Sequence, residues 1–247
     1  MKTSSRCGLL ASAVSLLLAL SLHDTAHAGL ITWGTPTAIS GDSDVVNTGT
    51  VVGAFNLGVS DVAPSVTVNG VTFAPFYVPG FITGSVALGN FTLGFDDSGA
   101  AASFSASAPF STLSSAYHDL LQRSVTDLGP GGAAITLTMQ GRTVGQGYSF
   151  QWWSNLSSPG QRHTSEAYGG VTLSSNPSSA DGGLGQYAVG TFTADSATQG
   201  LYFFSPDGDP LINAFQLRTV VPEPTSALLL LGSGIMLLLR RHRASAH

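Results

Sequence analysis

The sequence has one cysteine, Cys7, which lies before an apolar run near the amino terminus. The rest of the chain therefore offers no disulfide, thiol nucleophile or zinc–thiolate site. Charged residues make up only 9% of the chain, against about 25% in an average globular protein. Residues 29–221 contain no lysine, and their four arginines and twelve acidic residues give a net charge of −8. Such an acidic stretch repels phosphate backbones, so we predict no nucleic-acid partner.

The motifs of common enzyme classes are also missing. The domain has no G-x-S-x-G elbow, H-E-x-x-H pair, Walker loop or dinucleotide fingerprint. We therefore predict a protein that is not an enzyme and needs no cofactor. The alternative is a secreted glycan-active hydrolase that uses Asp or Glu, for which Asp96-Asp97 offers carboxylates.

Two short acidic pairs make calcium the one metal to consider. Asp42 and Asp44 are separated by a single residue, as are Asp207 and Asp209. Calcium takes several carboxylate and carbonyl oxygens from flexible loops, but Asp is also an ordinary turn residue. Neither pair completes an EF-hand, so we expect no metal site and keep these four residues as weak candidates.

The amino terminus has the three parts of a secretory signal peptide. Lys2 and Arg6 form a positive segment, residues 9–22 are apolar, and Ala26-His27-Ala28 is a small-x-small cleavage signal. We predict a signal peptide over residues 1–28 with cleavage before Gly29. The alternative is a buried N-terminal helix.

At the opposite end, Pro222-Glu223-Pro224 precedes an apolar run, residues 226–239, that is followed by arginines. A helix of about 15 residues spans roughly 22 Å, less than the roughly 30 Å of a hydrocarbon core. It would enter a membrane with local thinning. The positive-inside rule would keep the basic stop, Arg240, Arg241 and Arg243, in the cytoplasm. The domain before it, residues 29–219, then lies on the side to which the signal peptide directs it.

This three-part order over residues 220–247 resembles the PEP-CTERM sorting domain of Gram-negative bacteria. The resemblance implies that Pro222, Glu223 and Pro224 are the motif recognised by exosortase, a membrane processing enzyme. It also implies an association with exopolysaccharide or biofilm. The two prolines hold this strip extended, where an enzyme can bind it. The alternative is an ordinary C-terminal membrane anchor, which predicts the same location without processing.

The residues between the two ends are typical of an all-β protein. Apolar alternation between Gly, Pro, Asn and Asp predicts nine strands, over residues 50–55, 65–73, 84–88, 133–139, 148–153, 170–173, 186–193, 200–204 and 211–218. Asn69-Gly70 predicts a type I′ hairpin turn. One helix is predicted over residues 111–124, where Leu113, Tyr117, Leu120 and Leu121 share a face. We expect a two-sheet, jelly-roll-like sandwich with one short helix.

Four segments of this domain resemble carbohydrate-binding jelly rolls of the galactose-binding and malectin-like type. They are Tyr148-Ser-Phe-Gln-Trp-Trp, Arg162-His163, residues 190–195 and residues 212–217. The resemblance implies a polysaccharide ligand, and the tentative binding residues are Tyr148, Trp152, Trp153, Arg162, His163 and Glu166.

Each of these candidates also has a purely structural interpretation. Trp152 and Trp153 are neighbours on a strand, so one ring faces inward and the other faces outward. The outward ring either stacks on a sugar or lies under a covering segment. Arg162, His163 and Glu166 either border a ligand site or form a solvated strand edge with a local ion pair.

The sequence thus predicts an exported protein of the cell envelope, cell surface or extracellular matrix, anchored transiently or stably by its C-terminal helix. It predicts no catalysis, an exosortase-type partner and, for the sandwich, an extracellular polysaccharide partner. A purely structural matrix component is the remaining alternative.

Overall fold

The computed structural model describes residues 30–59, 64–103, 105–129, 134–160, 162–206 and 208–220. The predicted signal peptide with Ala26, Ala28 and Gly29 lies outside these residues. So does the predicted tail, including Pro222, Glu223, Pro224, Arg240, Arg241 and Arg243. No helix within the described ranges is long and apolar enough to cross a membrane.

The larger sheet has eight strands in the order β1-β14-β11-β17-β3-β5-β4, with β2 also paired to β14. The pair β3–β5 is parallel, and the other pairs are antiparallel. The strands are β1 (Thr32–Trp33), β2 (Thr37–Ala38), β3 (Thr50–Val59), β4 (Val66–Val68), β5 (Val71–Val78), β11 (Gly147–Ser154), β14 (Gln186–Thr193) and β17 (Ala214–Thr219).

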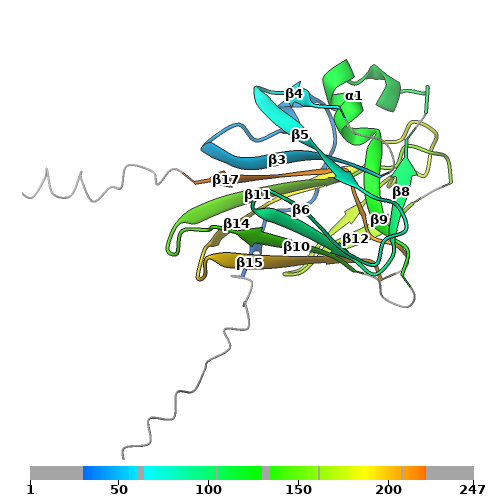
Figure 1. Ribbon diagram of the computed structural model, residues 1–247. Helices are drawn as coiled ribbons and strands as arrows, with labels where there is room; N and C mark the ends of the chain where they lie inside the picture. Colours follow the sequence, from blue (N-terminus) through cyan, green and yellow to red (C-terminus); the bar gives the residue numbers. More distant parts are fainter. Residues whose placement is uncertain are drawn as a thin grey trace, which may run out of the picture.

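The second sheet has six antiparallel strands in the order β13-β12-β15-β10-β7-β6. They are β6 (Gly84–Leu88), β7 (Phe91–Phe95), β10 (Ala134–Gln140), β12 (Thr164–Ala167), β13 (Val171–Ser174) and β15 (Thr198–Phe204). Figure 1 shows these strands as a layer beneath the larger sheet.

A small sheet and a short helix lie toward one end of the sandwich, beside β4 and β5 (Figure 1). The sheet has the order β16-β9-β8, formed by Leu211–Ile212, Arg123–Asp127 and Ser98–Ala102. The helix α1 is Ser115–Leu121, preceded by the 3-10 turn η2 (Phe110–Thr112); a second 3-10 turn, η1, is Asp42–Asp44. Ser114 caps α1 by accepting a bond from the Tyr117 amide at 3.2 Å.

The strand pairs are nested along the chain. β12 pairs with β13, β11 with β14, β10 with β15, and β3 with β17. From β10 to β17 the chain passes several times between the two large sheets, so each sheet contains strands that are distant in sequence. The outermost pair, β3 with β17, joins residues near the two ends of the domain.

Period-two alternation builds the main core between the two large sheets. Phe150, Trp152 and Phe215 point from the eight-stranded sheet toward Leu137 and Phe203 of the six-stranded sheet. The Trp152 and Phe203 rings meet edge to face at 4.9 Å. All five side chains are buried, so their area removed from water stabilises the face-to-face packing.

A second apolar cluster lies on the opposite face of the eight-stranded sheet. It contains Phe73, Tyr117, Leu120 and Trp153, all with no exposed surface. The helix α1 therefore covers part of this face with the side that the sequence predicted to be apolar.

The structure confirms a mostly strand architecture with several antiparallel sheets and one short helix. The predicted ranges 84–88 and 186–193 coincide with β6 and β14. Asn69 and Gly70 both have positive φ, 47° and 76°, as a type I′ turn requires. The predicted range 211–218 is instead two strands, β16 and β17, separated at Asn213.

Two sequence predictions of the fold were wrong in extent. The helix is shorter than residues 111–124, because Arg123 begins β9, which pairs with β8. Six strands, β1, β2, β7, β8, β9 and β12, were not predicted. They are two to five residues long, and such short runs give little periodic signal.

Candidate functional site

The three aromatic candidates from the sequence are all buried. Trp152 lies between the sheets, Trp153 lies under Phe73 and α1, and Tyr148 stacks on Phe192 with ring centroids 5.4 Å apart. Both indoles have no exposed surface, and Tyr148 is 3% exposed. These rings stabilise the two apolar clusters, and neither indole presents a face to a ligand, so the covered-face interpretation applies to the outward tryptophan.

The three polar candidates lie at the surface without forming a cluster of ion pairs. Arg162 is exposed, whereas His163 and Glu166 are half-buried. The His163 Nδ1 atom lies 3.1 Å from the Asp209 carbonyl. Within the described ranges the one ion pair joins His118 and Asp119 at 3.8 Å, so the local pair expected at residues 162–166 is not formed.

The first calcium candidate is a structural carboxylate. Asp44 is buried, and its two oxygens accept bonds from the Ser40 amide and hydroxyl, the Gly41 amide and the Tyr117 hydroxyl at 2.6–3.0 Å. Asp42 accepts a bond from Ser114 at 2.6 Å. With its acceptor sites occupied by protein donors, Asp44 is not arranged to bind a cation.

Only half of the second candidate pair is described, so the prediction for that pair stays open. Asp207 lies outside the described residues, and the backbone of Asp209 contacts His163. In the part of the chain that the structure describes, no three His, Cys, Asp or Glu residues come close enough to hold a metal ion.

Asp96 and Asp97, the carboxylates considered for a hydrolase, lie where β7 meets β8. The buried carboxylate of Asp127 accepts their two backbone amides at 2.8 and 2.9 Å and the Gly129 amide at 3.0 Å. Asp127 thus fixes this turn, and the Asp96 side chain points to solvent as an exposed residue.

A buried relay of hydrogen bonds joins Asp44, Tyr117 and Trp153. The Trp153 indole donates to the Tyr117 hydroxyl at 3.0 Å, and that hydroxyl donates to the Asp44 carboxylate at 3.0 Å. Burial, followed by the charge of Asp44, raises the pKa of the Tyr117 phenol well above its usual range. The relay therefore holds η1 against α1 and the eight-stranded sheet.

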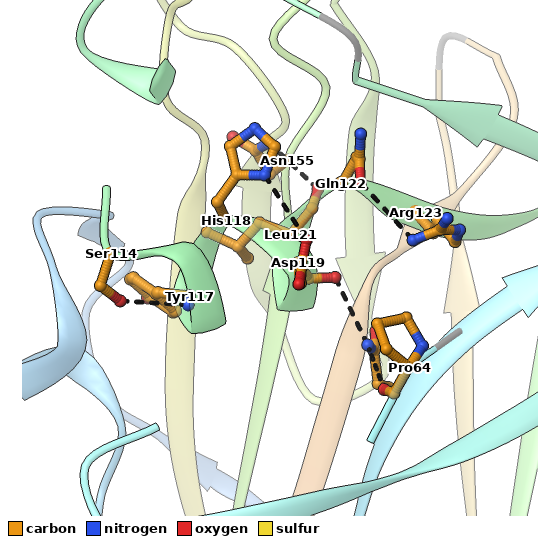
Figure 2. A network of polar contacts seen from close by, with 10 residues as sticks. Pro64, Ser114, Tyr117, His118, Asp119, Leu121, Gln122, Arg123 and Asn155 are labelled. Atoms are coloured by element: carbon orange, nitrogen blue, oxygen red, sulfur yellow. Dashed lines mark hydrogen bonds and ion pairs between the residues drawn. The ribbon is translucent and has the colours of Figure 1, made fainter. Parts of the chain in front are cut away.

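The helix α1 is also held at its carboxyl end, by buried amides. Figure 2 shows the contact of Asn155 with Leu121, whose carbonyl accepts from the Asn155 amide at 3.4 Å. The Leu121 carbonyl also accepts from Asn213 at 2.8 Å, and the Asp119 carbonyl accepts from Asn56 at 3.4 Å. All three asparagines have no exposed surface. Because an unsatisfied buried carbonyl costs stability, these amides fix the helix in place.

Residues 39–49 form a strap across the outer face of the eight-stranded sheet. Gln151 donates to the Asp44 carbonyl at 2.6 Å and accepts from the Val46 amide at 3.0 Å, and Gln216 donates to the Val46 carbonyl at 2.9 Å. Arg218 donates to three successive carbonyls, those of residues 47, 48 and 49, at 2.6–2.8 Å. Burial lowers the pKa of the Arg218 guanidinium. Its donors bond to these three backbone carbonyls and to the Gln216 side-chain oxygen.

Within the described ranges, no such segment covers the outer face of the six-stranded sheet. Alternate residues of its strands point inward, and those between them are partly or fully exposed. Cross-strand register places them in rows. One row is Ala87, Thr92, Thr138 and Gly200; the next is Ser85, Gly94, Thr136 and Tyr202; a third contains Phe204, Glu166 and Thr172.

This bare face is almost free of charge. Across all six strands Glu166 is the one charged residue. Tyr202 is 50% exposed, opposite Thr136. The face thus combines hydroxyls, small side chains and an accessible aromatic ring in an otherwise acidic domain.

Two open grooves lie on either side of β1 at the edge of the sandwich. One, of about 630 Å³, lies between residues 30–36 and residues 169–172, and includes Trp33. The other, of about 570 Å³, is lined by residues that include Leu30, Tyr148, Phe192 and Val220. The residues beside the two predicted processing segments, Leu30 and Val220, therefore meet at one groove.

The sequence analysis missed the accessible aromatic residues Trp33, Tyr168 and Tyr202. Tyr202 could have been found, because it alternates with the apolar Leu201 and Phe203 in a predicted strand. Trp33 lies on a two-residue strand and Tyr168 in a turn, and no periodic pattern marks either position.

Comparison with solved structures gives one distant likeness. It is a structure described as the basis for the promiscuous specificity of carbohydrate-binding modules from the β-sandwich superfamily. The TM-score is 0.16 at 12% identity, over 75% of this chain and 98% of that one, which is too low to establish a shared fold. No curated protein matches this sequence.

The C-terminal segment does match a known family. The match begins at Val220, directly after β17, and includes the Pro-Glu-Pro strip and the apolar run, as the sequence predicted. Proteins that carry this motif are exported and associated with the cell surface, and the motif implies processing by exosortase. Residues 220–244 of this chain are a PEP-CTERM protein-sorting motif.

Proposed function

We propose that this protein is a non-catalytic component of the cell surface or extracellular matrix, whose β-sandwich binds a neutral polysaccharide. The sorting motif supports the location. The observation that carries the binding clause is the bare outer face of the six-stranded sheet, with Tyr202 exposed among threonines and glycines.

The chemistry of this face suits neutral sugars. A pyranose ring offers hydroxyls on its edge and C–H groups on its face. Thr92, Thr136 and Thr138 can both donate and accept hydrogen bonds, and Tyr202 offers a ring on which a sugar can stack. A sulfated or phosphorylated polymer would require cations, and the strands of this sheet contain no lysine or arginine.

We also infer a jelly-roll topology for the sandwich. The nested pairs β12–β13, β11–β14, β10–β15 and β3–β17 support it, because a jelly roll is a long antiparallel ribbon wrapped into two sheets. Residues 64–129, between β3 and β10, would then be an insertion that supplies the helix, the strands β4 to β7 and two strands of the small sheet, β8 and β9.

Two of the acidic residues are buried in structural roles, so they do not supply a catalytic carboxylate. Asp44 and Asp127 are buried and bind backbone or hydroxyl donors. Neither carboxylate is free to act as an acid or a nucleophile on a polymer.

The proposed polysaccharide binding is tested with the full-length chain in mild detergent. The experiment measures how strongly the protein is retained on insoluble neutral polysaccharides. We expect wild type to be retained on at least one of cellulose, β-1,3-glucan, mannan or starch granules. The variant Tyr202→Ala should be released earlier, whereas Tyr77→Ala, a matched exposed tyrosine on β5, should behave as wild type. Absence of retention on every polymer would remove the binding clause and favour a purely structural matrix component.

The hydrolase alternative is tested on the same polymers. Release of reducing ends by wild type, lost in Asp96→Asn or Glu166→Gln, would show a glycan-active enzyme and overturn the non-catalytic clause. We expect no release above a buffer blank.

Sorting is tested by the intact mass of the protein from its own host. We expect an extracellular species that starts near Gly29 and ends near Pro222-Glu223-Pro224. A membrane species that retains residues 226–247 would indicate a simple anchor without processing.

A further inference from the structure

The sandwich is open along the edge where its two sheets end in short strands. At this edge β1 pairs only with β14, and β13 pairs only with β12. The groove of about 630 Å³ lies between these strands, within the roughly 300–1,000 Å³ typical of ligand sites. Its lining contains no charged residue, although the domain as a whole is acidic.

Trp33 is the aromatic residue of this groove, and its ring is fixed before any ligand arrives. The indole N–H donates to the Tyr168 carbonyl at 3.2 Å. The ring also meets Phe150 of the main core edge to face, with centroids 6.2 Å apart at 78°. A half-buried ring with these two constraints loses little further conformational entropy when it stacks on a ligand.

Glycines make room for this ring and leave the groove open. A Cβ atom at Gly190 would lie 2.5 Å from Trp33 Cε3, and one at Gly169 would lie 3.0 Å from Trp33 Nε1. Gly169 and Gly170 both have positive φ, at 104° and 94°, and a Cβ at Gly170 would meet only open space. The turn between β12 and β13 therefore carries no side chain over the groove at these two positions.

The groove is continuous with the bare face of the six-stranded sheet. The Tyr168 amide donates to the Tyr202 carbonyl at 2.8 Å, which holds the β12–β13 turn beside the exposed tyrosine. Thr172 belongs both to the groove lining and to the third row of the face. A chain that lies across the face can thus continue past Tyr168, which is 58% exposed, to Trp33.

We propose that this groove is a subsite for one sugar ring of the neutral polysaccharide, stacked on Trp33 and bordered by the hydroxyls of Thr35 and Thr172. The uncharged lining selects a neutral ligand, and the fixed indole supplies the stacking surface. This inference rests on the proposed polysaccharide function and adds to it a subsite that adjoins the Tyr202 face.

Tryptophan fluorescence gives a direct readout of this site. The chain has three tryptophans, and Trp152 and Trp153 have no exposed surface, whereas Trp33 is partly exposed. Collisional quenching by acrylamide should therefore report mainly on Trp33, and Trp33→Phe should remove most of the quenchable emission. A soluble neutral oligosaccharide, taken from the polymer that retains wild type, should protect the wild-type emission from acrylamide.

The binding experiment uses the full-length chain and that same oligosaccharide. We expect Trp33→Ala to weaken the affinity by about tenfold, as loss of one aromatic stacking contact predicts. Because Trp33 also packs on the core, Thr35→Arg provides a second test: it blocks the groove from an exposed position. It should weaken binding similarly, and its matched control, Thr67→Arg on β4, should not.

The outcomes separate the two proposals. If both Trp33→Ala and Thr35→Arg bind with unchanged affinity and the oligosaccharide gives no protection from acrylamide, the groove is not a subsite. Retention of wild type on the polymer would in that case still support the proposed function. Failure of wild type to bind any neutral polymer would overturn both. Weaker binding by the groove variants, together with acrylamide protection, would support the subsite.

Discussion

The two outer faces of the sandwich follow the same alternation of side chains but differ in what covers them. On the eight-stranded sheet, the outward residues include Gln151, Trp153, Gln216 and Arg218, all buried beneath residues 39–49 and α1. On the six-stranded sheet, the outward residues are mainly threonine, serine, glycine and alanine, together with Tyr202, and they are accessible. Long polar side chains therefore occur on the eight-stranded sheet, where they bond to residues 39–49. Short side chains with hydroxyl groups occur on the six-stranded sheet, where the outer face is accessible.

This contrast assigns different roles to the two faces. A buried amide or guanidinium has to be matched by partners, so the covered face specifies one packing arrangement. The open face carries short hydroxyls, such as those of Thr92, Thr136 and Thr138, that hold no covering segment in place. We therefore assign structural roles to the first face and propose recognition for the second.

The largest difference between the faces should appear when an aromatic residue is removed from each. Trp153→Ala loses its packing against Phe73 and Tyr187 and its bond to Tyr117. It should lower the free energy of unfolding by about 3–5 kcal/mol. Tyr202→Ala should change it by roughly 0.5 kcal/mol or less. Urea unfolding at 25 °C and pH 7 measures both, and equal losses would contradict the assignment of roles.

A matched pair of arginines sharpens the same comparison with a smaller effect. Arg218→Met leaves the carbonyls of residues 47–49 without their buried donor, at a cost of about 1–3 kcal/mol. Arg162→Met, at an exposed position near the six-stranded sheet, should cost roughly 0.5 kcal/mol or less. Hydrogen exchange should also show faster exchange over residues 39–49 in Arg218→Met alone. Unchanged exchange there would show that Arg218 does not hold the strap.

Alkaline pH should affect the covered face first. Tyr117 has a raised pKa in the folded protein, chiefly through burial and secondarily through Asp44, and it ionises near pH 10 when unfolded. A group whose pKa is higher in the folded than in the unfolded protein contributes its full stabilisation of the fold at pH values below the unfolded pKa. That contribution decreases as the pH rises above the unfolded pKa. Stability should fall above about pH 10 by roughly 1.4 kcal/mol per pH unit from Tyr117. Burial also raises the pKa of Tyr187, which adds to the same slope.

Variants test this alkaline slope in urea titrations from pH 8 to 11. Tyr117→Phe should start less stable, because it loses its bonds to Asp44 and Trp153, but should show a shallower decline above pH 10. Tyr202→Phe should keep the wild-type slope. An unchanged slope in Tyr117→Phe would show that this phenol is not the group that titrates.

Much of the sandwich follows from local sequence, because alternation and turn chemistry act over a few residues. Asn69-Gly70 specifies its turn, and residues 186–193 alternate clearly enough to define β14 at both ends. The sorting motif is likewise a contiguous signal. The helix was overextended because Arg123 and Ser124 fit a helix locally, and only their pairing with Ala102 and Ala101 places them in a strand.

The candidate site could not be located in the same way. Alternation predicts that Trp152 and Trp153 face opposite sides, but not that Phe73 and α1 cover the outward ring. Exposure of Tyr202 depends equally on the absence of a strap over its sheet. Burial of an outward residue is a long-range property, and for that reason the sequence left both the stacking and the covered interpretation of the outward tryptophan open.

The smallest effect on stability should come from removing hydroxyls from the open face. This change is also the most informative test of function. In the double variant Thr136→Val, Thr138→Val the side chains keep their branched shape and lose two hydroxyls from neighbouring rows. Both positions are half-buried on β10, and valine favours strands, so the free energy of unfolding should change by roughly 0.5 kcal/mol or less. Retention on a neutral polysaccharide should nevertheless weaken, because valine neither donates nor accepts a hydrogen bond. A control with Thr67→Val and Thr72→Val on the β4–β5 hairpin removes two exposed hydroxyls from the other sheet and should leave retention unchanged. If the β10 variant is retained as strongly as wild type, the threonine rows are not the recognition surface, and the difference between the two faces concerns packing alone.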